Sequence, residues 1–469
     1  SYFTFHSQMK VFFANGGTDC YIVSVGHYTK KNVAADGEET EVPNQIELDV
    51  LQTGIPPLLK EPEPTMLVIP EAVMVDVDRS KTDESLSKIY QLQQEMLRHC
   101  GGDMRNRFAI LDVWMDLTKI ESGEYDLTKD IDRFRKGIGN NHLSWGAAYY
   151  PWLRTTATAA SEVSFLNIDN LGEEGDIKVF TENTFNEKGE IIDKTAFKTE
   201  FIDRKVNSLV GLLDVALNQE VLDGLLNEAR ATTIKNEVKK LINFNREEIA
   251  TAASLNSALL AVSPIYKEIM NDIRARLNLL PPSAAMAGIY AMVDNTIGVF
   301  QSPANVSVGS VIKPVINITN EQQEDLNMPL SGKAINAIRS FPGKGTLVWG
   351  ARTLDGNSQD WRYVSVRRTV IFIEQSIKYA AEPYVFEPNT VATWANIKAL
   401  ITNFLTNVWQ SGALAGATPE DAFSVEVGLG TTMTAVDILD GYMRITVKLA
   451  VVRPAEFIVI TFEQKMQQS

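Results

Sequence analysis

Two segments in the last third of the chain decide how it folds. The first is Ile335-Asn336-Ala337-Ile338-Arg339-Ser340-Phe341-Pro342-Gly343-Lys344-Gly345, followed two residues later by Val348-Trp349-Gly350-Ala351-Arg352-Thr353-Leu354. The second is Val452-Arg453-Pro454-Ala455-Glu456-Phe457-Ile458-Val459-Ile460. Both combine β-forming apolar residues with turn residues, and neither has the spacing of a catalytic or cofactor motif. We therefore interpret both as structural segments.

The first part of the chain predicts a domain of alternating strands and helices. A chain of 469 residues is too long for one compact core, so we expect two or three domains. Short β-rich runs at 20–26, 66–69, 108–113 and 146–152 accompany a helical apolar stripe at 83–99. This alternation predicts an α/β unit with a mainly parallel sheet.

The middle of the chain changes character twice. A polar stretch at 167–193 predicts a surface excursion, and 203–279 has helical periodicity with few breakers. Pro281-Pro282 ends this helical region, because proline lacks the N–H that a helix interior needs. Residues 287–305 then predict a strand that leads into an extended loop.

The last part of the chain predicts a second domain, of α+β type. Helices are expected at 369–379 and 390–410. Strands are expected at 346–351, 364–366, 384–386, 424–427, 443–451 and 457–462. The predicted division is an α/β domain formed by 1–165 and 280–318, a mostly helical, outward-facing insertion at 166–279, and a C-terminal domain at 319–469.

Composition excludes several classes of protein. The formal net charge is −15, which argues against a broad nucleic-acid-binding surface. Residues 330–469 contain 13 basic and 12 acidic residues, so residues 1–329 carry a net charge of −16. No apolar run is long enough to cross a bilayer and no signal peptide opens the chain, so we expect no membrane insertion. Cys20 and Cys100 are interpreted as reduced thiols of a protein that folds in the cytoplasm.

A search for catalytic, cofactor and metal sites yields none. Metal-ligand spacing is absent from the histidines, which are His6, His27, His99 and His142. The segments Gly343-Lys344-Gly345 and Gly428-Leu429-Gly430 lack the full pattern of a phosphate-binding loop. A tight turn with glycine at positive φ is the simpler interpretation of the first. We therefore expect no catalytic residue, no cofactor and no metal.

One enzymatic alternative is open. Asp112 ends a buried-looking strand, and ligands gather at such strand ends in α/β folds. With His99 or His142 it could serve a hydrolase that carries an appended β-rich domain. A capping or ion-pair role is the competing interpretation, because the sequence offers no nucleophile to pair with Asp112.

Further motifs follow one another along the chain. They are Asn15-Gly16-Gly17, Leu67-Val68-Ile69-Pro70-Glu71, Trp361-Arg362-Tyr363-Val364, Phe372-Ile373-Glu374-Gln375-Ser376 and Arg453-Pro454-Ala455-Glu456-Phe457. Together with the two segments quoted above, they resemble the contractile tail sheath proteins of phages and of bacterial injection particles. The resemblance implies a subtilisin-like α/β sheath domain followed by an α+β C-terminal sheath domain. It implies no protease, because no Asp/His/Ser triad can be placed here.

The resemblance implies a structural role instead of an enzymatic one. Sheath subunits of this family polymerise as stacked hexameric rings around an inner tube and contract to drive the tube through a target envelope. The implied partners are neighbouring sheath subunits, the inner tube protein, and baseplate and terminal cap proteins, without nucleic acid. We expect assembly in the bacterial cytoplasm, as part of a phage tail or a phage-tail-like particle that is released or membrane-anchored.

The end of the chain is predicted to link one subunit to the next. An apolar, β-forming run would aggregate in a free monomer, so we expect it to pair with a neighbour's sheet. The predicted linking strand consists of Phe457, Ile458, Val459, Ile460, Thr461 and Phe462. Arg453 and Pro454 are the predicted hinge, because proline cannot donate to a central ladder. The extended N-terminal arm with which the family usually begins is expected to lie outside this chain.

The helix expected at 390–410 has two different faces. Its apolar stripe consists of Trp394, Ile397, Ile401, Phe404, Leu405 and Val408. The other face presents Lys398, Thr402, Asn403, Thr406 and Gln410. In the family a helix at this place touches the inner tube, so the resemblance implies that these five residues face the tube. A merely solvated face is the alternative interpretation.

Overall fold

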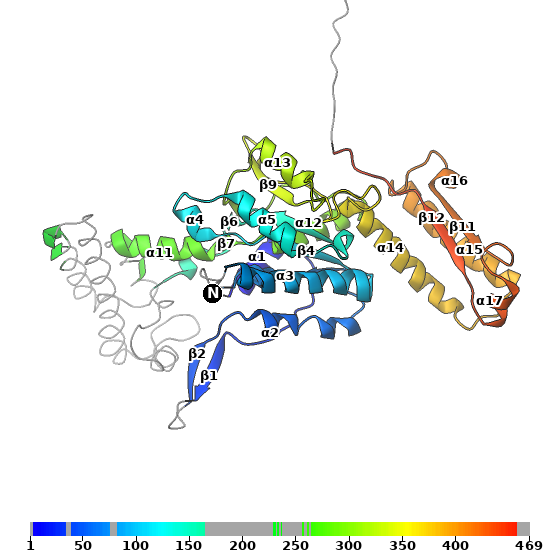
Figure 1. Cartoon of the computed structure of the whole chain (residues 1–469), viewed down its shortest axis with the longest axis horizontal. Coiled ribbons are helices and arrows are strands. Elements are labelled where there is room, and N and C mark those ends of the chain that lie inside the picture. The colour runs from blue at the N-terminus through cyan, green and yellow to red at the C-terminus, as the bar shows by residue number, and fades with distance from the viewer. Residues whose placement is uncertain are drawn as a thin grey trace, which may run out of the picture. The chain divides into compact units, whose positions relative to one another are not determined.

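The chain divides into two compact units. The computed structural model describes residues 3–33, 39–75, 82–164 and 264–456, together with 228–230, 232, 233, 236, 256, 257, 260 and 261. Unit 1 consists of Ser1–Val25, Ile46–Leu153 and Leu280–Ser469, and unit 2 of Gly26–Gln45 and Arg154–Leu279. Figure 1 shows the elements of both units.

A five-stranded sheet forms the centre of unit 1. Its strands lie in the order β10 (Gly345–Trp349), β9 (Asn336–Phe341), β5 (Gly146–Tyr150), β4 (Phe108–Asp112) and β3 (Met66–Val68). The last four pair in parallel, whereas β10 pairs antiparallel with β9. The predicted mainly parallel sheet is confirmed, as are the strands expected at 66–69, 108–113 and 146–152.

Helices cover both faces of this sheet. On one face, Phe108 and Tyr149 contact Tyr290 of α12 (Ser283–Thr296), and the two tyrosine hydroxyl oxygens lie 2.7 Å apart. On the other face, Gly146 lies against Leu97 of α3 (Thr82–Arg98), which confirms the helix expected at 83–99. Every residue of β4 and β5 is buried. Strands buried on both faces have continuous apolar runs, which is why the sequence predicts them well.

Shorter elements connect the strands and helices of unit 1. The remaining helices before the C-terminal part are α1 (Phe5–Ala14), α2 (Leu48–Gln52), α4 (Leu117–Glu121), α5 (Leu127–Gly137) and α13 (Asn320–Asn327). Single 3₁₀ or π turns occupy Pro56–Lys60, Pro70–Val73, His99–Met104 and Leu143–Trp145, and β8 occupies Val311–Pro314.

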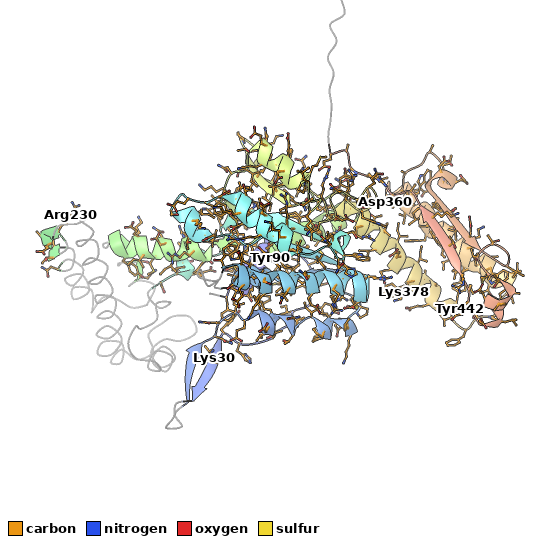
Figure 2. All side chains as sticks on the ribbon, viewed as in Figure 1. Lys30, Tyr90, Arg230, Asp360, Lys378 and Tyr442 are labelled. Atoms are coloured by element: carbon orange, nitrogen blue, oxygen red, sulfur yellow. The ribbon has the colours of Figure 1, made fainter. Side chains whose placement is uncertain are left out.

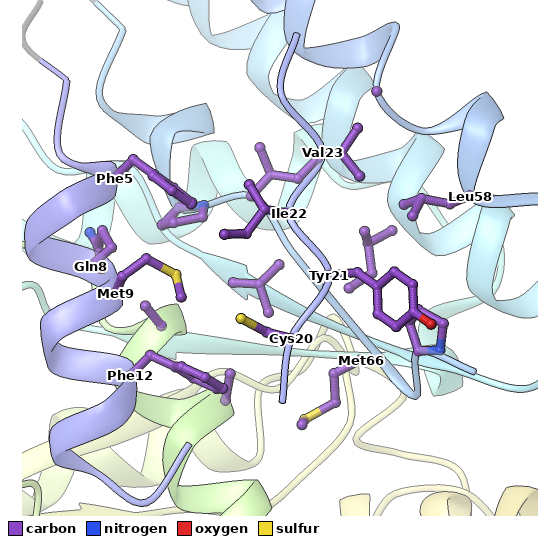
Figure 3. A pocket seen from close by; sticks show the side chains of 18 of the residues that line it. Phe5, Gln8, Met9, Phe12, Cys20, Tyr21, Ile22, Val23, Leu58 and Met66 are labelled. Atoms are coloured by element: carbon purple, nitrogen blue, oxygen red, sulfur yellow. The ribbon is translucent and has the colours of Figure 1, made fainter. Parts of the chain in front are cut away.

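The predicted strand at 20–26 is wrong. These residues are extended, but they are not a strand of the sheet. Its edge strand β3 has only three residues and offers few ladder hydrogen bonds. An apolar cavity of about 440 Å³ lies here, lined by α1, β3 and residues 19–25. In Figure 3, Phe5 and Phe12 of α1 lie across this cavity from Ile22.

Three other predicted strands are also wrong. The strand expected within 287–305 is replaced by α12, whose small residues let it approach α1 closely. Residues 364–366 form the first turn of α14 (Val364–Ala381). Residues 384–386 follow a turn at Glu382–Tyr384, and Phe386 has a φ of +71°, which a ladder does not allow. Tertiary packing overrides β propensity in the first two cases, and a proline-led turn does so in the third.

The C-terminal part of unit 1 follows the other predictions. α14 and α15 (Val391–Gln410) confirm the helices expected at 369–379 and 390–410. β10, β11 (Phe423–Val427) and β12 (Ile445–Leu449) confirm the strands expected at 346–351, 424–427 and 443–451. Short helices α16 (Pro419–Ala422) and α17 (Ala435–Leu439) lie between them in sequence. β9 and β10 belong to the five-stranded sheet although they fall within 319–469, and the predicted domain division remains a prediction.

Unit 2 is described in part. β1 (Thr29–Val33) and β2 (Glu39–Pro43) form an antiparallel hairpin. α11 (Pro264–Leu277) is the end of the helical region expected at 203–279, most of which lies outside the described residues. Asn278 then holds the chain at Thr158 through hydrogen bonds of 2.8 and 2.9 Å. The remaining elements are β6 (Leu153–Thr155), a turn at Ala160–Glu162 and β7 (Leu279–Leu280).

Gly288→Ala should lower stability although alanine is the better helix former. A Cβ atom at Gly288 would lie 2.3 Å from the backbone oxygen of Phe12, so α1 and α12 would have to separate. We expect a loss of about 1–3 kcal/mol in the free energy of unfolding, measured by urea denaturation. Gly102→Ala is the control, because its Cβ would meet its nearest neighbour, the His142 ring, at 3.5 Å. A Gly288→Ala protein as stable as wild type would contradict the close packing of the two helices.

Candidate functional site

A second sheet, of two strands, lies in the C-terminal part of unit 1 (Figure 1). β11 and β12 pair antiparallel along their whole length. On the outer face, Glu426 and Lys448 form an ion pair of 3.5 Å. The inner face packs on α15 and consists of Phe423, Val425, Val427, Ile445, Val447 and Leu449. The alternation of apolar and polar residues therefore assigns this sheet one buried face.

This small sheet is incomplete. Phe423 and Val425 of β11 are buried, whereas the inner side chains of β12 are only half-buried. Within the described ranges, β11 and β12 have only each other as strand partners. An isolated two-stranded sheet is marginally stable in water, and this one is supported on its inner face by α15. The sheet thus has both unfilled strand positions at its edges and unfilled apolar surface beside β12.

α15 supports the small sheet with the predicted apolar stripe. Trp394, Ile397, Ile401, Leu405 and Val408 are buried, and Phe404 is half-buried against the same core. Of the five residues predicted to face the tube, the exposed ones are Lys398, Asn403 and Gln410, and the half-buried ones are Thr402 and Thr406. Three of the five are therefore accessible, and their contact with a tube stays a prediction.

Two successive arginines hold the start of α14 against the five-stranded sheet. The Arg367 guanidinium lies between the rings of Trp361 and Trp145, at 3.5 and 4.5 Å from their centroids, and donates to the Ser144 hydroxyl at 3.1 Å. Arg368 forms a 2.5 Å ion pair with Asp294 of α12. Burial lowers the pKa of Arg367 to about 10, which leaves it charged at neutral pH. The first turn of α14 is therefore fixed to its surroundings by two buried side chains, Arg367 and Arg368. We call this first turn the root of α14.

The rest of α14 packs against α15 and the small sheet. Figure 2 shows Asp360 just before α14 and Lys378 near the far end of α14. The Asn389 side chain donates to the Tyr442 carbonyl at 2.9 Å, which joins the turn after α14 to the loop before β12. Ile373 of α14 is buried in the same core as α15 and β11.

The chain after β12 returns to the five-stranded sheet. The Val452 amide still donates to the Ala413 carbonyl at 3.2 Å, within the C-terminal part. Three residues on from the predicted hinge Arg453, the Glu456 carboxylate accepts from the Arg352 guanidinium, with the shortest contact at 2.6 Å. Arg453 itself reaches only Asp360, at 3.5 Å and exposed. The predicted linking strand at 457–462 lies outside the described residues.

The residues of the alternative hydrolase site have other structural partners. The Asp112 carboxylate accepts from the Ser283 amide at 2.8 Å and from the Ser283 hydroxyl, at the start of α12. His99 contacts the buried Arg107 guanidinium at 3.2 Å, and burial together with this positive charge lowers the pKa of His99. His142 adopts a positive φ beside Gly101. Asp112 therefore has the capping role that was its competing interpretation.

The described residues hold no group of three or more His, Cys, Asp or Glu side chains arranged to bind a metal. None of the helices in the described part of the chain is long and apolar enough to span a bilayer. Cys100 is buried, and Cys20 is exposed.

Comparison with known proteins finds a family that resembles the C-terminal part of the chain. The model of the phage tail sheath C-terminal domain matches residues 357–465, which contain α14, α15 and the small sheet. Over these residues the chain is similar to the tail sheath family. Its curated relatives include the tail sheath protein of Vibrio phage KVP40, 24% identical over 170 residues, and that of Enterobacteria phage T4, 25% identical over 126 residues. These matches cover 36% and 27% of the chain but only 25% and 19% of the two relatives.

The similarity to solved structures extends over nearly the whole chain. One is the baseplate of the anti-feeding prophage, at 25% identity and a TM-score of 0.53, covering 98% of this chain and 80% of the other. Another is the sheath complex of an extracellular contractile injection system in its contracted state, at 25% identity and a TM-score of 0.54, covering 99% and 81%. The mixed α/β architecture is therefore that of the contractile sheaths.

Sequence reasoning missed two groups of residues in this chain. The Arg352–Glu456 contact joins residues that are 104 positions apart, so no local pattern connects them. The root of α14 was hidden because 364–366 looked like a strand. One signal was available: Arg352, Arg367 and Arg368 stand in otherwise apolar or aromatic surroundings, and buried arginines need partners.

Asp112→Asn should remove a pH dependence of stability. Burial raises the pKa of Asp112 from its ordinary 3.8 to about 7, despite the hydrogen bonds from Ser283. The unfolded chain loses this proton near pH 4 and the folded chain only near pH 7, so wild type loses stability as pH rises between them. The loss corresponds to about 4 kcal/mol, whereas asparagine keeps an acceptor for the Ser283 amide and has no charge to bury.

The check is the difference between the unfolding free energies of the variant and wild type, from pH 4 to pH 8. The difference should favour Asp112→Asn increasingly up to about pH 7 and level off above it. A difference that does not change with pH would show that Asp112 ionises as an ordinary carboxyl.

Proposed function

We propose that this chain is a structural subunit of a contractile sheath, in which copies form stacked hexameric rings around an inner tube. The observation that carries the proposal is the incomplete β11–β12 sheet, followed in sequence by the apolar, β-forming run at 457–462. One copy thus has a small sheet with open strand positions and, next in sequence, a segment whose composition favours a strand.

Strand addition between copies would satisfy both features. A strand added at an edge gains backbone hydrogen bonds, and its alternate side chains would cover the half-exposed inner face of β12. Such a link survives rotation of the two subunits, because it depends on the backbone and not on the surface shape of the rigid parts. The predicted linking residues Phe457, Ile458, Val459, Ile460, Thr461 and Phe462 would serve here, with Arg453 and Pro454 as the bend before them.

Contraction would then be a rearrangement of rigid subunits that remain linked. The root of α14, with Arg367 and Arg368 both buried, keeps the C-terminal part fixed to the five-stranded sheet. Energy would come from contacts between subunits that increase in the shorter lattice, so no nucleotide is required. The parallel-sheet part would correspond to the subtilisin-like domain of the family, and the movement would drive the tube through a target envelope.

The other proposed partners follow from this role. The inner tube protein would bind the surface of α15 that carries Lys398, Thr402, Asn403, Thr406 and Gln410. Baseplate and terminal cap proteins would bind the two ends of the sheath. Assembly would take place in the bacterial cytoplasm, within a phage tail or a related injection particle.

Removing residues 457–469 should abolish polymerisation while leaving the monomer folded. The deleted segment supplies the proposed linking strand, whereas the residues up to 456 contain both sheets. Negative-stain microscopy and sedimentation of the purified chain should show tubes or sheath-like polymers for wild type only. Circular dichroism controls for folding. Polymers of normal yield from the truncated chain would contradict strand exchange, and a wild type that forms no polymer would contradict the sheath role.

Lys398→Glu should weaken binding to the inner tube without affecting sheath polymers. Lys398 is exposed on α15. Reversing its charge should reduce tube-filled sheaths by about tenfold, if the contact resembles other desolvated charge pairs at interfaces. Lys378→Glu on α14 is the matched control, since Lys378 is also exposed on a helix of the same part. Equal losses for both variants, or for neither, would contradict the assignment of this face.

A further inference from the structure

The Glu456 carboxylate is the last described group of the chain before the predicted linking strand, and it is bound in a built site. The Arg352 Nε donates to both carboxylate oxygens at 3.0 and 3.1 Å, and Nη2 donates to one of them at 2.6 Å. The Tyr363 hydroxyl donates to the same carboxylate at 3.2 Å, and the Asn327 side-chain amide contacts it at 3.4 Å. We call these four residues, Arg352, Glu456, Tyr363 and Asn327, the Glu456 clamp.

The clamp is buried, in contrast to an ordinary ion pair on a protein surface. The Arg352 side chain is 2% exposed and that of Glu456 is 17% exposed. The remaining Arg352 nitrogen, Nη1, donates to the carbonyls of Asn327 and Gly356 at 3.1 and 3.2 Å. A bidentate, buried pair of this kind is strongly weakened when one partner is removed, because the other charge is left buried and unpaired.

Arg352 is itself attached to the five-stranded sheet. Its backbone amide donates to the Asn336 side chain at 2.7 Å, and the Asn336 amide donates back to the Arg352 carbonyl at 2.7 Å and to the Ala148 carbonyl of β5 at 3.2 Å. Asn336 begins β9 and is fully buried. A continuous series of contacts thus runs from Glu456 through Arg352 and Asn336 to the centre of the sheet.

The chain before the clamp runs from the C-terminal part to Arg352 within a few residues. Val452 is still bound to Ala413 in the C-terminal part, and the four residues from Arg453 to Glu456 carry the chain to Arg352. Without the clamp, the last firm attachment would be Val452. Residues 453–456 would then be unattached, and four extended residues would let the start of the linking strand move by roughly 13 Å.

We propose that the Glu456 clamp is the anchor of the C-terminal linking segment, so that the segment leaves the subunit from the five-stranded sheet and not from the small sheet. The inference rests on the proposed sheath function, and it names the residues that position the linking strand. A segment held at its root reaches a neighbouring sheet at a higher effective concentration than a slack one. A force applied to the linking segment during contraction would be transmitted through Glu456 and Arg352 to the five-stranded sheet.

The test compares Glu456→Gln with Asp360→Asn. Glu456→Gln keeps the size and one acceptor oxygen but removes the charge that Arg352 requires. Asp360→Asn removes the partner of Arg453 in an ion pair of 3.5 Å whose side chains are 53% and 78% exposed, only three residues along the segment. An exposed pair of this kind contributes little, so Asp360→Asn is a matched control that removes another contact of residues 453–456.

Hydrogen exchange of the monomer is the first measurement, made on the full chain. Glu456→Gln should speed exchange of the Arg352 amide, which donates to the Asn336 side chain at 2.7 Å, by about tenfold or more, since the buried pair is lost, and Asp360→Asn should leave it within about twofold of wild type. Arg352→Lys provides a second variant from the other side of the contact, because lysine cannot form the bidentate pair. The double variant should exchange no faster than the more affected single variant, as expected if both act on one contact.

Polymerisation is the second measurement. The lowest concentration at which polymers form should rise by about tenfold or more for Glu456→Gln and stay unchanged for Asp360→Asn. Faster exchange together with this rise supports the anchor. Normal exchange, or normal polymerisation despite faster exchange, overturns it. If wild type itself forms no polymer, the sheath function fails, and hydrogen exchange alone then decides whether Glu456 holds the segment.

Discussion

Burial of β4 and β5 on both faces is the constraint on which the rest of unit 1 depends. Their backbone groups must be paired by neighbouring strands and their side chains covered by helices, which requires β3, β9, α3 and α12 in their observed places. Asp112, at the end of β4, caps α12, and α12 in turn supplies Asp294 to Arg368. The central sheet thus positions α12, and α12 in turn positions the start of α14.

The two sheets of unit 1 have opposite properties. The five-stranded sheet is buried, and its functional importance is that other parts are attached to it, at Arg367, Arg368 and Arg352. The small sheet has open edges and a half-covered apolar face, so its backbone groups and apolar side chains are available to another molecule. Three buried arginines, each with aromatic, carboxylate or hydroxyl partners, connect the closed part to the open one. A structural role needs both a body that does not deform and surfaces that are incomplete alone.

The sequence predicts those elements whose environment is uniform along their length. Residues 108–113 are buried on both faces, and the stripe of α15 repeats over about four turns, so their patterns are unambiguous. Residues 20–26 have an equally good strand pattern but lie beside a three-residue edge strand. Residues 364–366 have a strand pattern that the buried contacts of Arg367 and Arg368 override. Glu456 was quoted with its motif, but its partner lies 104 positions away, which local patterns cannot detect.

The small size of the β11–β12 sheet links the folding of this part of the chain to the amount of protein present. The small sheet is held on one face by α15, and strands from other copies in the proposed sheath would add to its stability. Because those strands bind only the folded subunit, association would stabilise the fold. The apparent stability of this part of the chain would therefore rise with the concentration of subunits.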